Sequence, residues 1–108
     1  MVILPYATTL LSAGQAERAF GLLADASKTH ALNPETYKLL AQAAGTTGKA
    51  VQTHVAMSQY YFLNGYTKQA LEQLKLADNQ HGISNYQAAR IQVGIKNLEK
   101  VLEEEKLE

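Results

Sequence analysis

The chain has 108 residues, which is the length of a single domain, and ten Lys and Arg balance ten Asp and Glu. A formal net charge of zero leaves no basic footprint for nucleic acid or an anionic membrane, so we expect neither as a partner. The absence of Cys excludes disulfides, thiolate zinc sites and a thiol nucleophile. No apolar run approaches the ~20 residues of a membrane-spanning helix, so we expect no membrane span.

Six helices are predicted, because helix-forming residues fill the intervals between glycine and proline signals. Their expected ranges are 4–13, 15–29, 34–45, 49–63, 67–80 and a last helix that begins after Ser84. Gly65 supplies the left-handed stop after the fourth helix. Asn33 and Pro34 are typical of an N-cap and a first helical turn, and Ser84 with Gln87 is typical of a capping box.

Apolar and small residues recur at three- and four-residue steps, which predicts one inward stripe per helix. The inward positions are Ala16, Ala19, Phe20, Leu23 and Ala26, then Tyr37, Leu40, Ala41 and Ala44, then Val51, Val55, Ser58, Tyr61 and Phe62, then Ala70, Leu71, Leu74 and Ala77, and finally Ile91, Ile95, Leu98 and Leu102. No segment shows the alternation of a strand. The expected fold class is therefore all-α.

A repeat underlies this pattern. Gly14 and Gly48 lie 34 residues apart, and Gly65 follows after half that interval, 17 residues. Small and apolar residues recur at offsets of five, nine and twelve behind two of these glycines: Ala19, Leu23 and Ala26, and Ala70, Leu74 and Ala77. The period, the offsets and the aromatic Tyr61 before Gly65 resemble the tetratricopeptide repeat (TPR), which implies a right-handed α-solenoid of about six antiparallel helices.

The middle unit departs from the TPR consensus. Thr53 stands where alanine is expected, Met57 where a larger aromatic residue is common, and Ile3, Tyr37 or His54 where tryptophan begins a repeat. Two registers overlap by half a repeat in the helix over 49–63, so the sequence does not choose which face of the solenoid is concave.

A narrower resemblance covers about two-thirds of the chain, residues 33–99. The runs PETYKLLAQAAG (34–45), AMSQYYFLNG (56–65), QALEQL (69–74) and YQAARI (86–91) are similar to the TPR tail of BepA-type periplasmic zinc metallopeptidases. The paired tyrosines before the glycine turn and the final helix opened by Tyr-Gln-x-x-Arg-Ile carry this likeness.

The resemblance implies a parent protein with a signal peptide and a zinc-binding HExxH catalytic domain, neither of which is in this chain, and a periplasmic location. It also implies that the tail docks on its own peptidase domain and handles outer-membrane proteins during assembly or quality control. We therefore expect residues 1–106 to be one helical domain cut from a longer protein, with Leu107-Glu108 similar to a cloning scar.

Catalytic or metal chemistry is not expected in this fragment, and neither is a cofactor. His30, His54 and His81 fall on or beside different helices, so no pair has the spacing of zinc ligands. His30 and His81 are expected near the carbonyl ends of the second and fifth helices. The serines lack a G-x-S-x-G elbow, and a catalytic role for the fragment is the weakest of three hypotheses.

Protein binding is the expected function, because polar and aromatic positions lie beside the apolar stripes. The candidate binding residues are Lys38, Gln42, Gln59, Tyr60, Phe62, Tyr66, Tyr86 and Arg90. Adjacent Tyr60 and Tyr61 point about 100° apart, so one can fill the core while the other reaches a groove. The alternative is that all the tyrosines pack between repeats.

Two further expectations concern partners. Arg90 could pair with a carboxylate of the fifth helix or of the absent catalytic domain. Barely two and a half repeats leave exposed end faces, which favours a homodimer or docking on a neighbouring domain. The alternative to a peptidase tail is a free-standing TPR adaptor or co-chaperone scaffold.

Overall fold

The computed structural model describes residues 3–107, and these fold into six α-helices without a strand. The helices are α1 (Ile3–Ser12), α2 (Ala16–Thr29), α3 (Pro34–Thr46), α4 (Ala50–Leu63), α5 (Thr67–Asp78) and α6 (Asn85–Lys106). The all-α prediction is confirmed, and each expected boundary lies within two residues of the observed one. Leu107 forms the C-cap of α6. Met1 and Glu108 lie outside the described residues, so the predictions of a fragment boundary at Met1 and of a cloning scar that ends at Glu108 concern residues that the structure does not describe.

The predicted helix ends form as the side chains dictate. Asn33 Oδ1 accepts the Glu35 backbone N–H at 3.0 Å, which caps α3. Ser84 Oγ accepts the Gln87 N–H at 3.0 Å, and Gln87 Oε1 accepts the Ser84 N–H at 3.1 Å, so the capping box of α6 is complete. Gly65 has a φ of +84° after α4, where a side chain would be strained.

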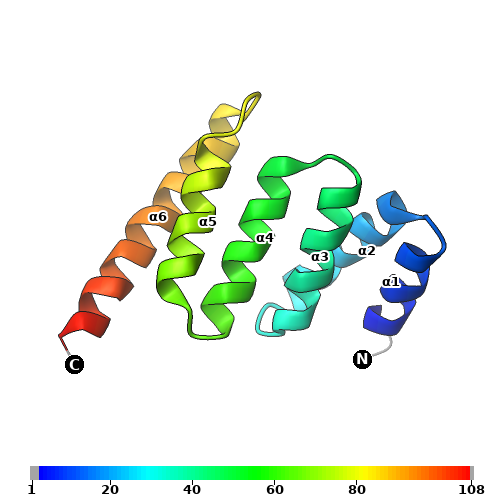
Figure 1. Ribbon diagram of the computed structural model, residues 1–108, viewed down its shortest axis with the longest axis horizontal. Coiled ribbons are helices and arrows are strands. Elements are labelled where there is room, and N and C mark those ends of the chain that lie inside the picture. Colours follow the sequence, from blue (N-terminus) through cyan, green and yellow to red (C-terminus); the bar gives the residue numbers. More distant parts are fainter. Residues whose placement is uncertain (1–2, 108) are drawn as a thin grey trace.

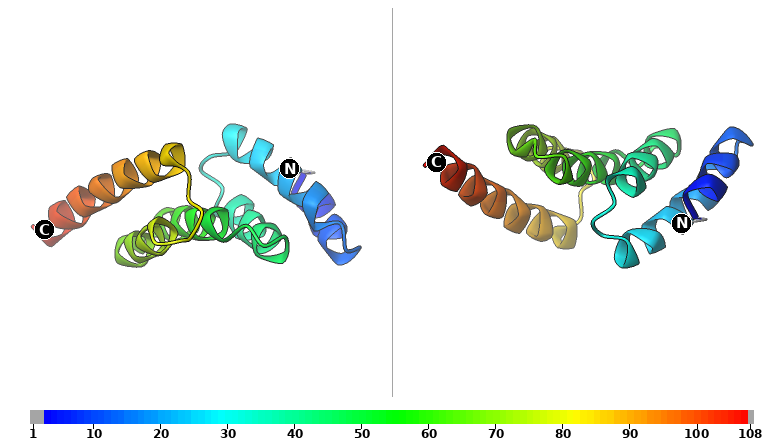
Figure 2. Two further views of the ribbon diagram at one scale, coloured as in Figure 1. Left: turned by 90° about the horizontal axis from the view of Figure 1, so that it is seen from above. Right: turned by 90° about the horizontal axis from the view of Figure 1, so that it is seen from below.

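The helices form an antiparallel array in which each one packs against the next along the chain (Figure 1). α3, α4 and α5 lie side by side in one layer. Figure 2 shows that α2 and α6 both lie on the same side of this layer, at opposite ends of it. Within residues 3–107, no helix therefore lies across from α4 in the interval between α2 and α6 (Figure 2).

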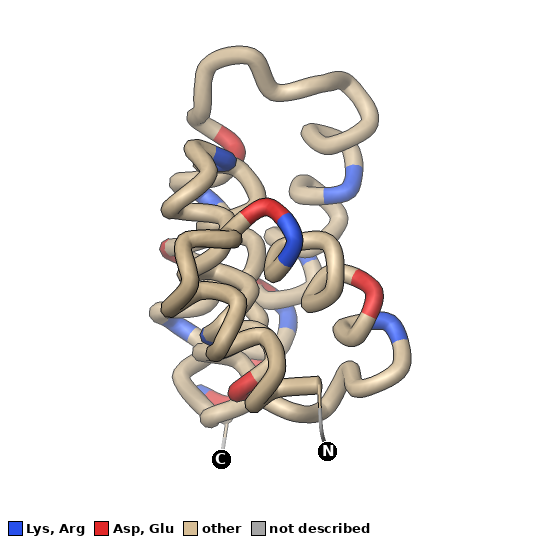
Figure 3. Tube along the Cα trace, turned by 90° about the vertical axis from the view of Figure 1, so that its right-hand side faces the viewer, with Lys and Arg blue, Asp and Glu red and all other residues tan. Residues whose placement is uncertain are grey.

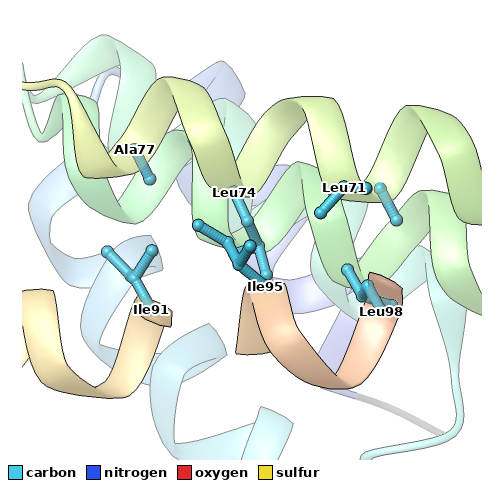
Figure 4. Close-up of a cluster of buried hydrophobic side chains, with 7 residues drawn as sticks. Leu71, Leu74, Ala77, Ile91, Ile95 and Leu98 are labelled. Atoms are coloured by element: carbon cyan, nitrogen blue, oxygen red, sulfur yellow. The ribbon is translucent and has the colours of Figure 1, made fainter. Parts of the chain in front are cut away.

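The hydrophobic core is divided into two clusters. One joins α5 to α6, and Figure 4 shows Leu71, Leu74 and Ala77 of α5 directed toward α6. Their partners on α6 are Ile91, Ile95 and Leu98. The other cluster joins α1, α2 and α3 around Ala7, Leu10, Ala19, Leu23 and Ala43. The inward stripes predicted for the second, fifth and sixth helices are thus confirmed, with Phe20 and Leu102 at the margins.

Small residues join the two halves where α3 packs against α4. Ala41, Ala44 and Ala56 are buried but belong to neither cluster, which allows the backbones to approach closely. Ser58 is also buried, and its Oγ donates to the Ala70 carbonyl oxygen at 2.8 Å, linking α4 to α5. The halves therefore form one continuous array although their apolar clusters are separate.

Several positions differ from the predicted stripes, among them Ala43, Ala56 and Thr67, which are buried although no stripe included them. Phe62 was expected on the inward face of the fourth helix, but it is exposed in the last turn of α4, where the helix ends at the turn of Gly65. Thr36 was not among the expected inward positions, yet it is fully buried. Its Oγ1 has no hydrogen-bond partner within residues 3–107.

The two ends of the array have different surfaces. α1 contains no charged residue, whereas α6 carries acidic and basic residues along its length. Lys and Arg are interspersed with Asp and Glu over the trace as a whole, without a large region of one sign (Figure 3). Among residues 3–107, no helix combines the length and the apolar character needed to cross a membrane.

Candidate interaction groove

A groove of about 450 Å³ runs between α2 and α6, above α3 and α4. Its walls come from α2 (Phe20, Ala24, Ser27) and from α6 (Tyr86, Gln87, Arg90, Ile91, Gly94). Its floor comes from α3 (Tyr37, Leu40), α4 (Val51, Gln52, Val55, Ala56, Gln59) and Leu74 of α5. The groove therefore lies where the second layer of helices is incomplete.

The floor is apolar and only half covered. Val51 and Val55 pack against the α5–α6 cluster on one side, and Leu40 packs against the α1–α3 cluster on the other. Each of the three also lines the groove. Together with Tyr37 they were predicted to face inward, and the structure places them at the junction of the two clusters, where a part of each side chain remains exposed.

The α2 wall is fixed by Lys49, which precedes α4. The Lys49 ammonium lies 2.8 Å and 2.9 Å from the two carboxylate oxygens of Glu17. The same nitrogen lies 5.0 Å from the centroid of the Phe20 ring, which is a cation–π contact. These contacts hold the start of α4 against α2 and keep Phe20 at the edge of the groove.

The part of the α6 wall that carries Tyr86, Gln87 and Arg90 extends beyond the end of α5, whereas Gly94 lies beside Leu74 of α5. Asp78, the last residue of α5, accepts a hydrogen bond from Gln92 Nε2 at 2.6 Å, so the first two turns of α6 continue past that point. Tyr86 lies in this extension and is 70% exposed. The Arg90 guanidinium lies 5.7 Å from the Tyr86 ring centroid, with Nη1 3.4 Å from the Tyr86 hydroxyl oxygen.

Arg90 thus contacts Tyr86, and of the two alternatives left open for its partner, a carboxylate of α5 does not pair with it in residues 3–107. Asp78, at the end of α5 beside α6, is bound to Gln92 instead. No carboxylate among residues 3–107 lies within ion-pair distance of Arg90. Among residues 3–107, Arg90 is therefore the one charged residue that lines the groove, and its guanidinium retains donors for a further acceptor.

Uncharged polar groups complete the lining. The amides of Gln52 and Gln59 lie two helical turns apart on α4 and reach the groove. Burial raises the pKa of the Tyr37 hydroxyl above its ordinary value. The floor of the groove thus combines aliphatic side chains with uncharged polar groups, and Tyr86 and Arg90 stand on its α6 wall.

The structure brings together three of the eight candidate binding residues, Gln59, Tyr86 and Arg90. Lys38, Gln42, Tyr60, Phe62 and Tyr66 do not line the groove. Tyr60 contacts Tyr61 edge to face at a centroid distance of 5.7 Å, and Tyr61 contacts Tyr66 at 6.4 Å. Because Tyr61 packs against the α5–α6 cluster, this row of rings links the core to the surface beside the α4–α5 turn.

The histidines are separated in space as well as in sequence. His30 ends α2, where its backbone N–H donates to the Ala26 carbonyl oxygen at 2.8 Å. His54 Nδ1 lies 2.8 Å from Gln73 Oε1 and bridges α4 and α5. Over residues 3–107, no three His, Asp or Glu side chains gather as a metal-binding group.

Comparisons with known proteins add no relative to this description. No family model matches the chain. No curated protein matches it either.

Proposed function

We propose that this chain is a non-catalytic protein–protein interaction module and that the groove between α2 and α6 is its binding surface. The observation that carries the proposal is the half-covered apolar floor, bordered by an exposed tyrosine and an arginine without a carboxylate partner in residues 3–107. Aromatic residues and arginine supply most of the energy at protein interfaces. Apolar surface enclosed by a polar rim is also typical of such sites.

A more specific proposal follows from the sequence resemblance alone. Its paired tyrosines (Tyr60 and Tyr61) and its Tyr-Gln-x-x-Arg-Ile helix are similar to the TPR tail of BepA-type periplasmic zinc metallopeptidases. We propose that the chain serves such an enzyme in outer-membrane protein assembly or quality control. Zinc would then be held by the catalytic domain, and the partner would be that domain or an outer-membrane client. The alternative is a free-standing adaptor or co-chaperone scaffold.

Site-specific photocrosslinking in cells that carry the native gene tests the proposed surface. Benzoylphenylalanine replaces Gln59 in the groove or, as a matched control, Gln69 on the exposed side of α5. Both sites are exposed glutamines on neighbouring helices, so the two variants differ chiefly in their position relative to the groove. We expect a discrete crosslinked partner from position 59 and none from position 69.

Mass spectrometry of the crosslinked band then separates the alternatives. Recovery of a peptidase domain or an outer-membrane protein supports the peptidase-tail proposal, and recovery of an unrelated protein supports the adaptor. Equal crosslinking from positions 59 and 69, or none from either, would contradict the interaction groove.

A further inference from the structure

We propose that the occupant of the groove is an amphipathic α-helix of a partner protein, with an acidic side chain that pairs with Arg90. This inference deepens the proposed function and rests on it. It specifies the secondary structure and the charge of the partner, neither of which follows from protein binding alone.

The incomplete layer favours a helix. α2 and α6 occupy the same side of the α3–α4–α5 layer, and the groove lies in the interval between them (Figure 2). A helix laid in this interval would complete a second layer of three over the first layer of three. Helices pack by placing the side-chain ridges of one into the grooves of another, and an apolar floor walled by two helices offers that surface.

The composition of α4 gives independent support. Ala50–Leu63 contains no Asp, Glu, Lys or Arg, and its apolar residues are spread around the helix instead of forming one stripe. A helix with that composition is normally enclosed on all sides. In this fold α3 and α5 cover two sides of α4, yet Val51 and Val55 remain partly exposed on the side that lines the groove. A partner helix would cover this remaining apolar part of the α4 surface.

Charge complementarity with Arg90 indicates that the partner helix carries a carboxylate. Arg90 is the one charged residue that lines the groove, and no carboxylate among residues 3–107 pairs with it. The stacked Tyr86 ring orients the guanidinium without neutralising it. A carboxylate on the docked helix would form a charge-assisted hydrogen bond with Arg90, while its apolar face covers Val51 and Val55.

Two displayed peptide libraries test the inference. The helical library contains peptides of about 18 residues, or five turns, with apolar residues fixed at i, i+4 and i+7 and with Glu, Gln or Lys varied elsewhere. The extended library has the same length, with prolines at regular intervals that prevent helix formation. Both are selected against the wild-type chain, and dissociation constants of the enriched peptides are measured by fluorescence anisotropy.

Paired variants locate the binding and its charge preference. Arg90→Glu reverses the charge in the groove, and Lys96→Glu makes the same change at an exposed position of α6 outside it. Ala24→Trp fills the groove, and Gly21→Trp adds the same ring on α2 in open space. Circular dichroism melts confirm that each variant is folded before its affinity is measured.

We expect the helical library to yield Glu-containing peptides that bind about tenfold more weakly to Arg90→Glu, as for close charge pairs at interfaces. Lys96→Glu should leave their affinity unchanged, and a Glu→Lys peptide should recover binding to Arg90→Glu. Ala24→Trp should abolish binding, and Gly21→Trp should not.

Enrichment of the extended library alone, with binding lost in Ala24→Trp, would overturn the helical partner but preserve the interaction groove. Enrichment of neither library, or binding indifferent to Ala24→Trp, would overturn both.

Discussion

Replacement of Leu23 by alanine is expected to lower the free energy of unfolding by about 2–5 kcal/mol. Leu23 is fully buried in the α1–α3 cluster, where it packs among Ala7, Leu10, Ala19 and Ala43. These alanines are too small to move into the cavity that the substitution would leave. Domains of this size have stabilities of only about 5–15 kcal/mol, so the melting temperature should fall by about 10 °C or more.

Leu32→Ala is the matched control, because it makes the same chemical change at a residue that is 85% exposed between α2 and α3. Its effect on the free energy of unfolding should stay within about 0.5 kcal/mol. Urea unfolding followed by circular dichroism measures both variants. Equal losses of stability would show that Leu23 is not the centre of a close-packed cluster.

Ala44→Leu has the second largest expected effect, a loss of about 1–3 kcal/mol from overpacking. Ala44 is fully buried and belongs to neither apolar cluster, and α3 packs directly against α4. A larger side chain there would push the two helices apart and so separate the halves of the array. Because the floor of the groove spans these two helices, its width would change as well.

Ala89→Leu, at an exposed position of α6, controls for the added side chain. This variant should unfold within about 0.5 kcal/mol of the wild type. If Ala44→Leu were equally harmless in urea unfolding, the α3–α4 contact would have room for a leucine, and small residues would not be what joins the two halves.

The helices and most of their inward faces could be predicted from the sequence because local chemistry determines them. The Asn33 cap, the Ser84–Gln87 capping box and the left-handed Gly65 each form as expected. Ala70, Leu71, Leu74 and Ala77 are all buried, because this stripe of α5 faces its neighbouring helices α4 and α6. Phe62 was misplaced because periodicity assigns a face to a residue but does not show where the neighbouring helices end.

The groove could be predicted only in part. Tyr86 and Arg90 were predicted as binding residues because they are an aromatic and a polar position beside an apolar stripe, and both line the groove. Phe20, Tyr37 and Val51 line it too, but they were assigned to the core. Their spacing in the sequence assigns them to the apolar side of their helices. The sequence does not show that α2 and α6 stand apart, so that within residues 3–107 a part of this apolar side is left uncovered. One signal was available: the sequence of 50–63 contains no charged residue, which sets this helix apart from the charged helices beside it.

The most direct test of the interaction groove uses the partner protein that is crosslinked from position 59. Its affinity is measured for two alanine variants of this chain. Tyr86→Ala removes an exposed ring from the groove, and Phe62→Ala removes an exposed ring outside it. Surface plasmon resonance should show binding weakened about tenfold or more by Tyr86→Ala, as for an interface hot spot, and unchanged within about twofold by Phe62→Ala. Equal affinities for the two variants, or a greater loss with Phe62→Ala, would contradict the assignment of the groove as the binding surface.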